Sequence, residues 1–188
     1  MIIVCSLSDF NNVCESTKPT HAISVIDPGF EPNTPKSVKN HLKLGFDDIV
    51  SIHDNGPLYR LPGQEKSIKQ TLFNEDNLTS IVNFVKTWSP KSSIVIHCWC
   101  GVSRSMATAT YLLCKKNIDN IEKNIQYIRS IAPHANPNKL LIKLFEENLG
   151  TKGQIANSYE KYPYTKTYDC SSNFAPITLF KYEEMVAF

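Results

Sequence analysis

Short apolar runs that alternate with amphipathic stretches dominate the first half of the chain. Four of these runs predict strands: "IIVCSL" at 2–7, "HAISVID" at 21–27, "NHLKLGF" at 40–46, in which apolar and polar residues alternate, and "SSIVI" at 92–96. The apolar part of the last run is uninterrupted, which is typical of a central strand covered on both faces.

Amphipathic stretches between and after these runs predict helices. "SDFNNVCES" predicts a short helix with Ser8 as its N-cap, and "NEDNLTSIVNFVKTW" predicts a longer one that is capped by Asn74 and stopped by Pro90. Three consecutive helices are then predicted from "SRSMATATYLLCKK", "IDNIEKNIQYIRSI" and "PNKLLIKLFEENLG", the last with Gly150 as a C-cap signal. In the middle of these three helices, isoleucines recur at helical spacing, and we expect them to pack in the core: 118, 121, 125, 128 and 131.

Strands that alternate with helices, followed by a series of helices, predict an α/β fold. We expect a central, mainly parallel sheet of four to five strands, flanked by helices. The main domain is predicted at 1–150, because beyond it the composition becomes polar and rich in tyrosine. Residues 151–188 are expected to form a tail, or an extension that packs on the same domain, with "NFAPITLF" as a late extended segment. Residues 49–74 read as a long irregular loop, which in a compact domain is usually functional or mobile.

Composition narrows the class of protein. The 188 residues carry a formal net charge of +2, so nothing global points to nucleic acid or to a membrane surface. No apolar stretch approaches membrane-spanning length, and the N-terminus lacks the basic start of a signal peptide, which favours the cytoplasm. The six cysteines form no Cys-x-x-Cys pair and no zinc-ligand spacing, so we expect most of them to be reduced and buried.

Residues 93–105, "SIVIHCWCGVSRS", combine a buried strand, a turn of small neutral residues and the start of a helix. Cys98 ends the strand, where open α/β sheets bind their ligands. A curled turn would aim the N–H groups of 99–104 inward and form an anion site together with the helix N-terminus. Gly101 permits a backbone geometry that a Cβ forbids, and Arg104 adds a planar fork of donors for phosphate oxygens. The pattern predicts a thiolate that attacks the central atom of a bound oxyanion.

His97-Cys98-Trp99-Cys100-Gly101-Val102-Ser103-Arg104-Ser105 resembles the His-Cys, five residues, Arg-Ser/Thr signature of the cysteine-dependent protein tyrosine phosphatases. The "GVSRS" end is similar to the dual-specificity branch. "IRSIAPHANPNKLL" is similar to the Pro-Asn segment that opens a later helix in that branch. The layout of residues 1–150 is most similar to small bacterial members of the dual-specificity group, and the motif match itself covers 96–105.

The resemblance implies a role for each residue of the motif. It makes Cys98 the nucleophile that forms a phosphocysteine intermediate, and it makes Ser105 the hydroxyl that stabilises the thiolate as leaving group. His97 orients the loop and is not a general base. The phosphoryl oxygens are bound by Arg104 and by the loop residues Trp99, Cys100, Gly101, Val102 and Ser103. No metal or other cofactor is implied.

Cys100 stands where the family needs no cysteine, and two interpretations remain open. It is a small filler, or it is a redox partner that traps an oxidised Cys98. A disulfide between residues two apart has poor geometry, so Cys5, Cys14 and Cys114 are alternative partners.

The resemblance also implies a general acid, an aspartate that protonates the leaving group. Asp48 follows the predicted strand 40–46 as the acid of the family follows a strand, and Asp47 is the alternative beside it. Cys98 follows Asp48 by 50 residues, more than is usual in the family, and the extra length lies in the loop 49–74. Two carboxylates on that loop therefore remain candidates, Asp54 and Glu65. Asn136 and Asn138 either approach the site or cap the following helix.

The turn carries no cation besides Arg104, which indicates a monophosphorylated substrate rather than a polyphosphoinositide. Trp99 at the rim either stacks on an aromatic ring or packs against a neighbouring loop. We therefore expect a protein-tyrosine or dual-specificity phosphatase that acts on phosphotyrosine in proteins or peptides, with phosphoserine and phosphothreonine as further substrates. Two alternatives stay open: a catalytically weak phosphate-binding module that lacks the acid, and an arsenate reductase or rhodanese-like enzyme.

Overall fold

A mainly parallel sheet lies at the centre of the protein. The structure is a computed structural model, and it describes residues 1–52, 69–168 and 174–187. Its five strands run in the order β3-β2-β4-β1-β5. They are β1 (Ile2–Cys5), β2 (His21–Ile26), β3 (Asn40–Gly45), β4 (Ile94–His97) and β5 (Thr178–Phe180). The first four are parallel and β5 pairs antiparallel with β1, so the predicted sheet is confirmed, with β4 in the middle.

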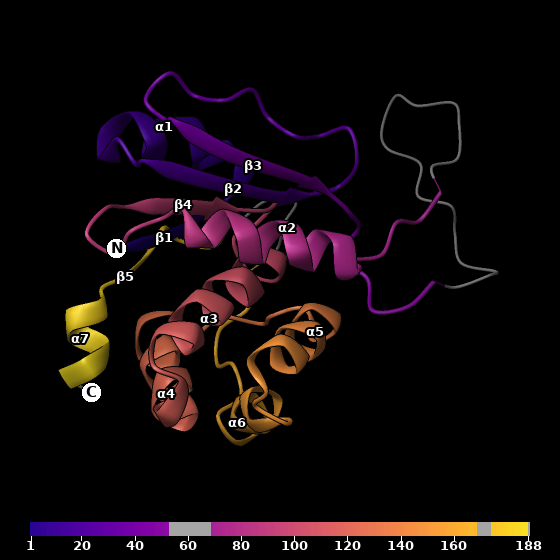
Figure 1. The fold of residues 1–188 in the computed structure, drawn as a ribbon, viewed down its shortest axis with the longest axis vertical. Coiled ribbons are helices and arrows are strands. Elements are labelled where there is room, and N and C mark those ends of the chain that lie inside the picture. The colour runs from indigo at the N-terminus through magenta and orange to yellow at the C-terminus, as the bar shows by residue number, and fades with distance from the viewer. Residues whose placement is uncertain (53–68, 169–173, 188) are drawn as a thin grey trace.

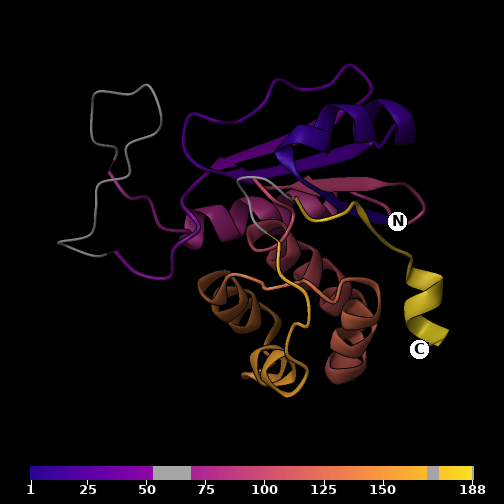
Figure 2. The ribbon, with the colours of Figure 1, turned by 180° about the vertical axis from the view of Figure 1, so that it is seen from behind.

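Helices cover the two faces of this sheet unequally. Among the described residues they are α1 (Leu7–Thr17), α2 (Glu75–Lys86), α3 (Arg104–Lys116), α4 (Ile121–Ile131), α5 (Lys139–Leu149), α6 (Gln154–Lys161) and α7 (Tyr182–Ala187). Helix α1 lies on one face, whereas α2 to α6 lie on the other (Figures 1 and 2). None of the described helices is both long and apolar enough to cross a membrane.

The strands alternate between these two layers. Ile3 and Cys5 of β1 join a small core with Phe10 of α1, while Ile2 and Val4 belong to the main core on the opposite face. The isoleucine stripe enters that main core through positions 121, 125 and 128, whereas the side chains at 118 and 131 are each 39% exposed. The prediction of core packing therefore holds for the middle of the stripe.

Several helix ends differ from the sequence prediction. Ser6, not Ser8, caps α1, because its Oγ accepts the N–H of Asp9 at 3.2 Å. Asn74 caps α2 as predicted, and Gly150 ends α5 with φ +73°. Helices α6 and α7 were not predicted, while the expected late extended segment contributes β5.

Candidate active site

The segment 98–103 between β4 and α3 forms a tight loop at the carboxyl end of the sheet. Gly101 has φ +75°, and a Cβ at this position would lie 3.1 Å from the carbonyl carbon of Cys5. Glycine is thus required both by the conformation and by the close approach. The N–H of Leu7 donates to the carbonyl of Trp99 at 3.1 Å, which ties the loop to the start of α1.

Cys98 presents a buried, free thiol to a cleft of ≈ 440 Å³. Its Sγ lies 3.1 Å from the Oγ of Ser105, which is buried in the first turn of α3. The hydroxyl is therefore placed to donate a hydrogen bond to a thiolate. Cys100 is disulfide-bonded while Cys98 is free, so these two cysteines are not bonded to each other.

Hydrogen bonds hold one side of the Arg104 guanidinium, and the Asp48 carboxylate lies near its other side. The guanidinium is only 2% exposed, and its NH1 donates to Asp27 Oδ1 at 2.6 Å and to the carbonyl of Phe46 at 2.5 Å. Its Nε is buried and has no hydrogen-bond partner, because Asp48 Oδ2 lies 3.9 Å away. A buried donor on a charged group that lacks an acceptor is costly, so the arrangement fits an oxyanion that completes it.

Asp27 is a site residue that the sequence analysis missed. Its second oxygen, Oδ2, accepts the indole N–H of Trp99 at 2.9 Å, so one carboxylate joins the loop to the arginine. Trp99 also packs against Phe30, with ring centroids 5.2 Å apart, and thus contacts a neighbouring loop as one alternative predicted. The signal for Asp27 was its position directly after a strand, because β2 lies beside β4 and both end at the same edge of the sheet.

Asp27→Asn is expected to lower the free energy of unfolding by about 2 kcal/mol, because an amide cannot accept from both Arg104 and Trp99. Inorganic phosphate should then raise the melting temperature of the variant more than that of the wild type, since the anion supplies the missing negative charge. Thermal unfolding with and without phosphate measures both effects. Asp119→Asn, at an exposed position, is the control. If phosphate raises the melting temperatures of Asp27→Asn and of the wild type equally, the assignment of Asp27 as the partner of Arg104 is contradicted.

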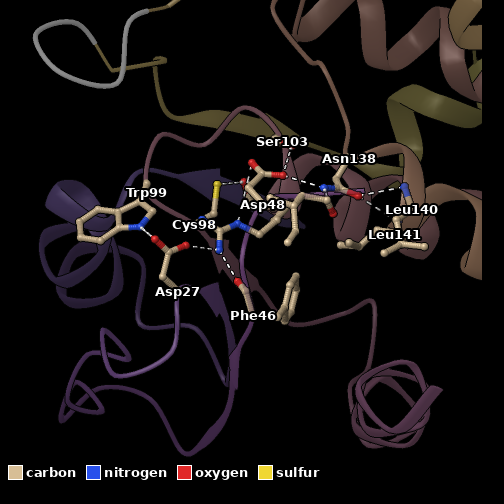
Figure 3. Close-up of polar contacts among 12 residues, drawn as sticks. Asp27, Phe46, Asp48, Cys98, Trp99, Ser103, Asn138, Leu140 and Leu141 are labelled. Carbon is tan, nitrogen blue, oxygen red and sulfur yellow. Dashed lines mark hydrogen bonds and ion pairs between the residues drawn. The ribbon is translucent and has the colours of Figure 1, made fainter. Parts of the chain in front are cut away.

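Two adjacent aspartates lie at the same end of β3 but make different contacts. Asp48 Oδ1 accepts from Ser103 Oγ and from Asn138 Nδ2, each at 2.8 Å, so the carboxylate lies against the loop 98–103 that carries Cys98 (Figure 3). Asp47 is tied to Thr71, whose N–H donates to Oδ2 at 2.6 Å and whose carbonyl accepts the N–H of Asp47 at 2.8 Å. Both aspartates line the cleft, and of the two it is Asp48 that is hydrogen-bonded to this loop. Outside the described residues lie the two other candidates, Asp54 and Glu65.

Asn138 combines the two duties that were predicted as alternatives. Its Oδ1 caps α5 by accepting the N–H groups of Leu140 and Leu141 at 2.9 and 3.2 Å. Its Nδ2 donates to Asp48, which holds the carboxylate over the loop. Asn136 touches the loop through its backbone, since its N–H donates to the carbonyl of Val102 at 3.0 Å.

His97 lies buried next to Cys98. Its Nε2 is 2.6 Å from Ser24 Oγ, and its Nδ1 is 3.3 Å from the carbonyl oxygen of Cys98. Burial lowers the pKa of His97 to about 4, although the hydrogen bond to the Cys98 backbone opposes this shift. The ring is therefore neutral at physiological pH, with both nitrogens engaged, as expected of a residue that orients the loop.

The walls of the cleft are apolar and acidic. Ile49, Trp99 and Val102 contribute apolar surface, and the three aspartates 27, 47 and 48 contribute carboxylates. Among the described residues that line the cleft, Arg104 is the only cation. Gly101, which was expected to bind substrate, shapes the loop and is not among these lining residues.

A strand that delivers a free thiol to a loop closed by a buried arginine defines a cysteine-dependent phosphatase. The family model described as "Dual specificity phosphatase, catalytic domain" matches residues 37–148, and the chain belongs to this family. The resemblance drawn from the motif is thereby confirmed. Phosphatase chemistry through a cysteine follows from this membership, while the individual residue roles remain proposals.

Solved structures share the fold at low sequence identity. DUSP15 superposes with a TM-score of 0.56 at 16% identity, covering 87% of this chain and 94% of its own. The Yvh1 phosphatase domain from Chaetomium thermophilum gives 0.54 at 19% identity, with coverages of 82% and 93%. PTPMT1, solved in complex with PI(5)P, gives 0.55 at 16% identity, with coverages of 84% and 94%. No curated protein sequence matches the chain significantly.

Proposed function

We propose that this protein hydrolyses phosphotyrosine in proteins or peptides through a phosphocysteine intermediate, with phosphoserine and phosphothreonine as further substrates. The observation that carries the proposal is the buried Nε of Arg104, which has no hydrogen-bond partner beside a cleft that reaches the free thiol of Cys98. A phosphoryl group that accepts from Nε and from the loop N–H groups is held with its phosphorus facing Sγ.

In the first step the Cys98 thiolate attacks phosphorus, and the bond from phosphorus to the leaving oxygen breaks. Asp48 donates its proton to that oxygen, so that an alcohol or phenol leaves rather than its anion. The negative charge that develops on the equatorial oxygens is stabilised by Arg104 and the loop amides. The products of this step are phosphocysteine and the dephosphorylated side chain.

In the second step water attacks the phosphorus of phosphocysteine while the Asp48 carboxylate accepts a proton from it. The bond between phosphorus and Sγ breaks, and inorganic phosphate leaves. Ser105 Oγ, 3.1 Å from Sγ, donates a hydrogen bond to the thiolate that is released. This lowers the energy of the leaving group, because a hydrogen bond to a charged acceptor is about twice as strong as one between neutral groups.

The charge of the cleft supports a singly phosphorylated substrate. A second phosphate would approach three aspartates with no described cation other than Arg104 to offset them. Ile49 and Val102 offer apolar walls for the ring of a phosphotyrosine. A phosphoinositide remains the competing substrate to test, since PTPMT1 was solved with PI(5)P.

The test is hydrolysis by the wild-type chain in the presence of EDTA. We expect turnover of para-nitrophenyl phosphate, and a higher kcat/KM on a phosphotyrosine peptide than on phosphoserine peptides or PI(5)P. Phosphate binding without turnover would instead indicate a phosphate-binding module. Thiol-dependent reduction of arsenate, or sulfur transfer from thiosulfate, would indicate the remaining alternative.

Asn138→Ser is expected to lower kcat about tenfold while the melting temperature changes little. Serine still caps α5, but it cannot reach Asp48 as the amide does. The loss should be larger for phenyl phosphate than for para-nitrophenyl phosphate, since the poorer leaving group depends more on the acid. Asn74→Ser, a cap substitution at α2 away from the cleft, is the matched control. An equal loss on both substrates would contradict a role for Asn138 through Asp48.

A further inference from the structure

A line of polar side chains runs beneath α1 from the edge of the sheet to the nucleophile loop. Thr34 Oγ1 lies 3.0 Å from His41 Nδ1, and His41 Nε2 lies 2.7 Å from Ser24 Oγ. Ser24 Oγ lies 2.6 Å from His97 Nε2, and His97 Nδ1 lies 3.3 Å from the carbonyl oxygen of Cys98. The four contacts form one continuous relay.

The register of the sheet brings these residues together. Ser24 of β2 pairs with His97 of β4, and His41 of β3 pairs with Ala22, two residues before Ser24. Alternation along a strand therefore places all three polar side chains on the face that α1 covers. Phe10 of α1 packs on both imidazoles, with ring centroids 4.2 Å from His97 and 5.4 Å from His41. The inner part of the relay, Ser24 and His97, is thus buried beneath the helix that anchors the loop, whereas Thr34 at the outer end is exposed.

Hydrogen-bond chemistry allows only one direction along this relay. The Cys98 carbonyl can only accept, so Nδ1 of His97 must carry the proton. His97 and His41 are both neutral at physiological pH, since burial lowers the pKa of each to about 4. Nε2 of His97 must then accept from the Ser24 hydroxyl.

The same reasoning settles the outer half of the relay. The Ser24 oxygen has given its only proton to His97, so it accepts from Nε2–H of His41. Nδ1 of His41 accepts in turn from the hydroxyl of Thr34. Every donor points toward Cys98, and aligned hydrogen bonds of this kind polarise and strengthen one another.

We propose that Ser24 and His41 are positioning residues that act through His97 to orient the peptide between Cys98 and Trp99. None of the described peptide bonds is cis, and in a trans peptide the C=O and N–H point in opposite directions. A carbonyl of Cys98 held toward His97 therefore turns the N–H of Trp99 toward the bound phosphate. The effect of this orientation on the rate of hydrolysis rests on the proposed function. The tautomers of the two histidines do not depend on it.

The direct test is nitrogen-15 NMR of the histidines in the full chain at neutral pH. We expect His97 as the Nδ1–H tautomer and His41 as the Nε2–H tautomer. A wild-type His97 protonated on Nε2 would overturn the proposal, because the relay would then end on a carbonyl without a donor. If the protein shows the expected tautomers but does not hydrolyse the substrate, the relay stands and the proposed function fails.

Variants supply the kinetic test. Ser24→Ala should lower kcat/KM on para-nitrophenyl phosphate about tenfold, with most of the loss in kcat, and should change the tautomer signal of His97. Ser24→Thr retains the hydroxyl and should recover part of the rate, and His41→Phe should cost about threefold. His21→Phe is the matched control, because His21 is a histidine buried on the same strand that bonds instead to Thr20 and Thr87. If Ser24→Ala leaves both kcat/KM and the tautomer signal of His97 unchanged, Ser24 is not a positioning residue.

Discussion

Cys98→Ser is expected to lower kcat on para-nitrophenyl phosphate by at least about 10⁴-fold. A serine hydroxyl ionises far less readily than a thiol, so the first step loses its nucleophile. An alkoxide also leaves phosphorus less readily than a thiolate, so the second step loses its leaving group. The anion site should survive, because Arg104 and the backbone of the loop are unchanged. Phosphate should therefore still raise the melting temperature of the variant.

Cys114→Ala is the control for this substitution. It removes another buried, free thiol, on the helix that follows the loop, and should leave kcat within about twofold. Initial rates of the three proteins, measured with phosphate-induced stabilisation on the same samples, separate loss of chemistry from loss of binding. Cys98→Ser with more than a few per cent of the wild-type rate would show that the nucleophile lies elsewhere.

The nucleophile loop could be predicted from sequence because its parts are consecutive. A buried strand, a glycine that needs φ +75° and a helix start follow one another within 93–105, so local patterns are sufficient. The same holds for the caps at Asn74 and Gly150, which are formed by residues next to the helices they end. Even here the choice between Ser6 and Ser8 depended on a two-residue difference in where α1 begins.

Contacts between strands could not be predicted in the same way. Asp27 reaches Arg104 only because β2 lies next to β4, and Ser24 meets His97 only because of the register between those strands. Neither the order of the strands nor their register can be read from a single sequence. The acidic partner of the arginine and the relay behind the cysteine therefore required the structure.

Helix α6 could not be predicted from the sequence for a different reason. Most of α6 is polar, and its buried positions are limited to Ile155 and Ser158, so the apolar pattern that indicates a helix is weak. Tertiary packing supplies what the pattern lacks. The buried carboxylate of Glu146 accepts the N–H of Ile155 at 2.6 Å, which satisfies a donor at the start of α6.

Asp48→Asn is expected to lower kcat on phenyl phosphate about 10²- to 10³-fold. The amide retains the size of the side chain and can still accept from Ser103 and Asn138, so the cleft should keep its shape. It has no proton to give to the leaving oxygen. The loss should be smaller for para-nitrophenyl phosphate, whose leaving group needs less assistance. The kcat of the wild type should fall toward high pH, and this basic limb of the profile should be absent from the variant.

Asp47→Asn makes the comparison decisive, because it changes a neighbouring carboxylate at the same end of β3. Its oxygen can still accept the N–H of Thr71, so the segment before α2 remains anchored and kcat should stay within about threefold of wild type. The pH profiles of kcat for both variants and the wild type, on both substrates, test the assignment. If Asp47→Asn loses the high-pH limb and Asp48→Asn keeps it, the proton comes from Asp47, and the hydrogen bonds of Asp48 to the loop serve structure alone. If both variants keep the limb, neither aspartate is the acid, and Asp54 and Glu65 are the next substitutions.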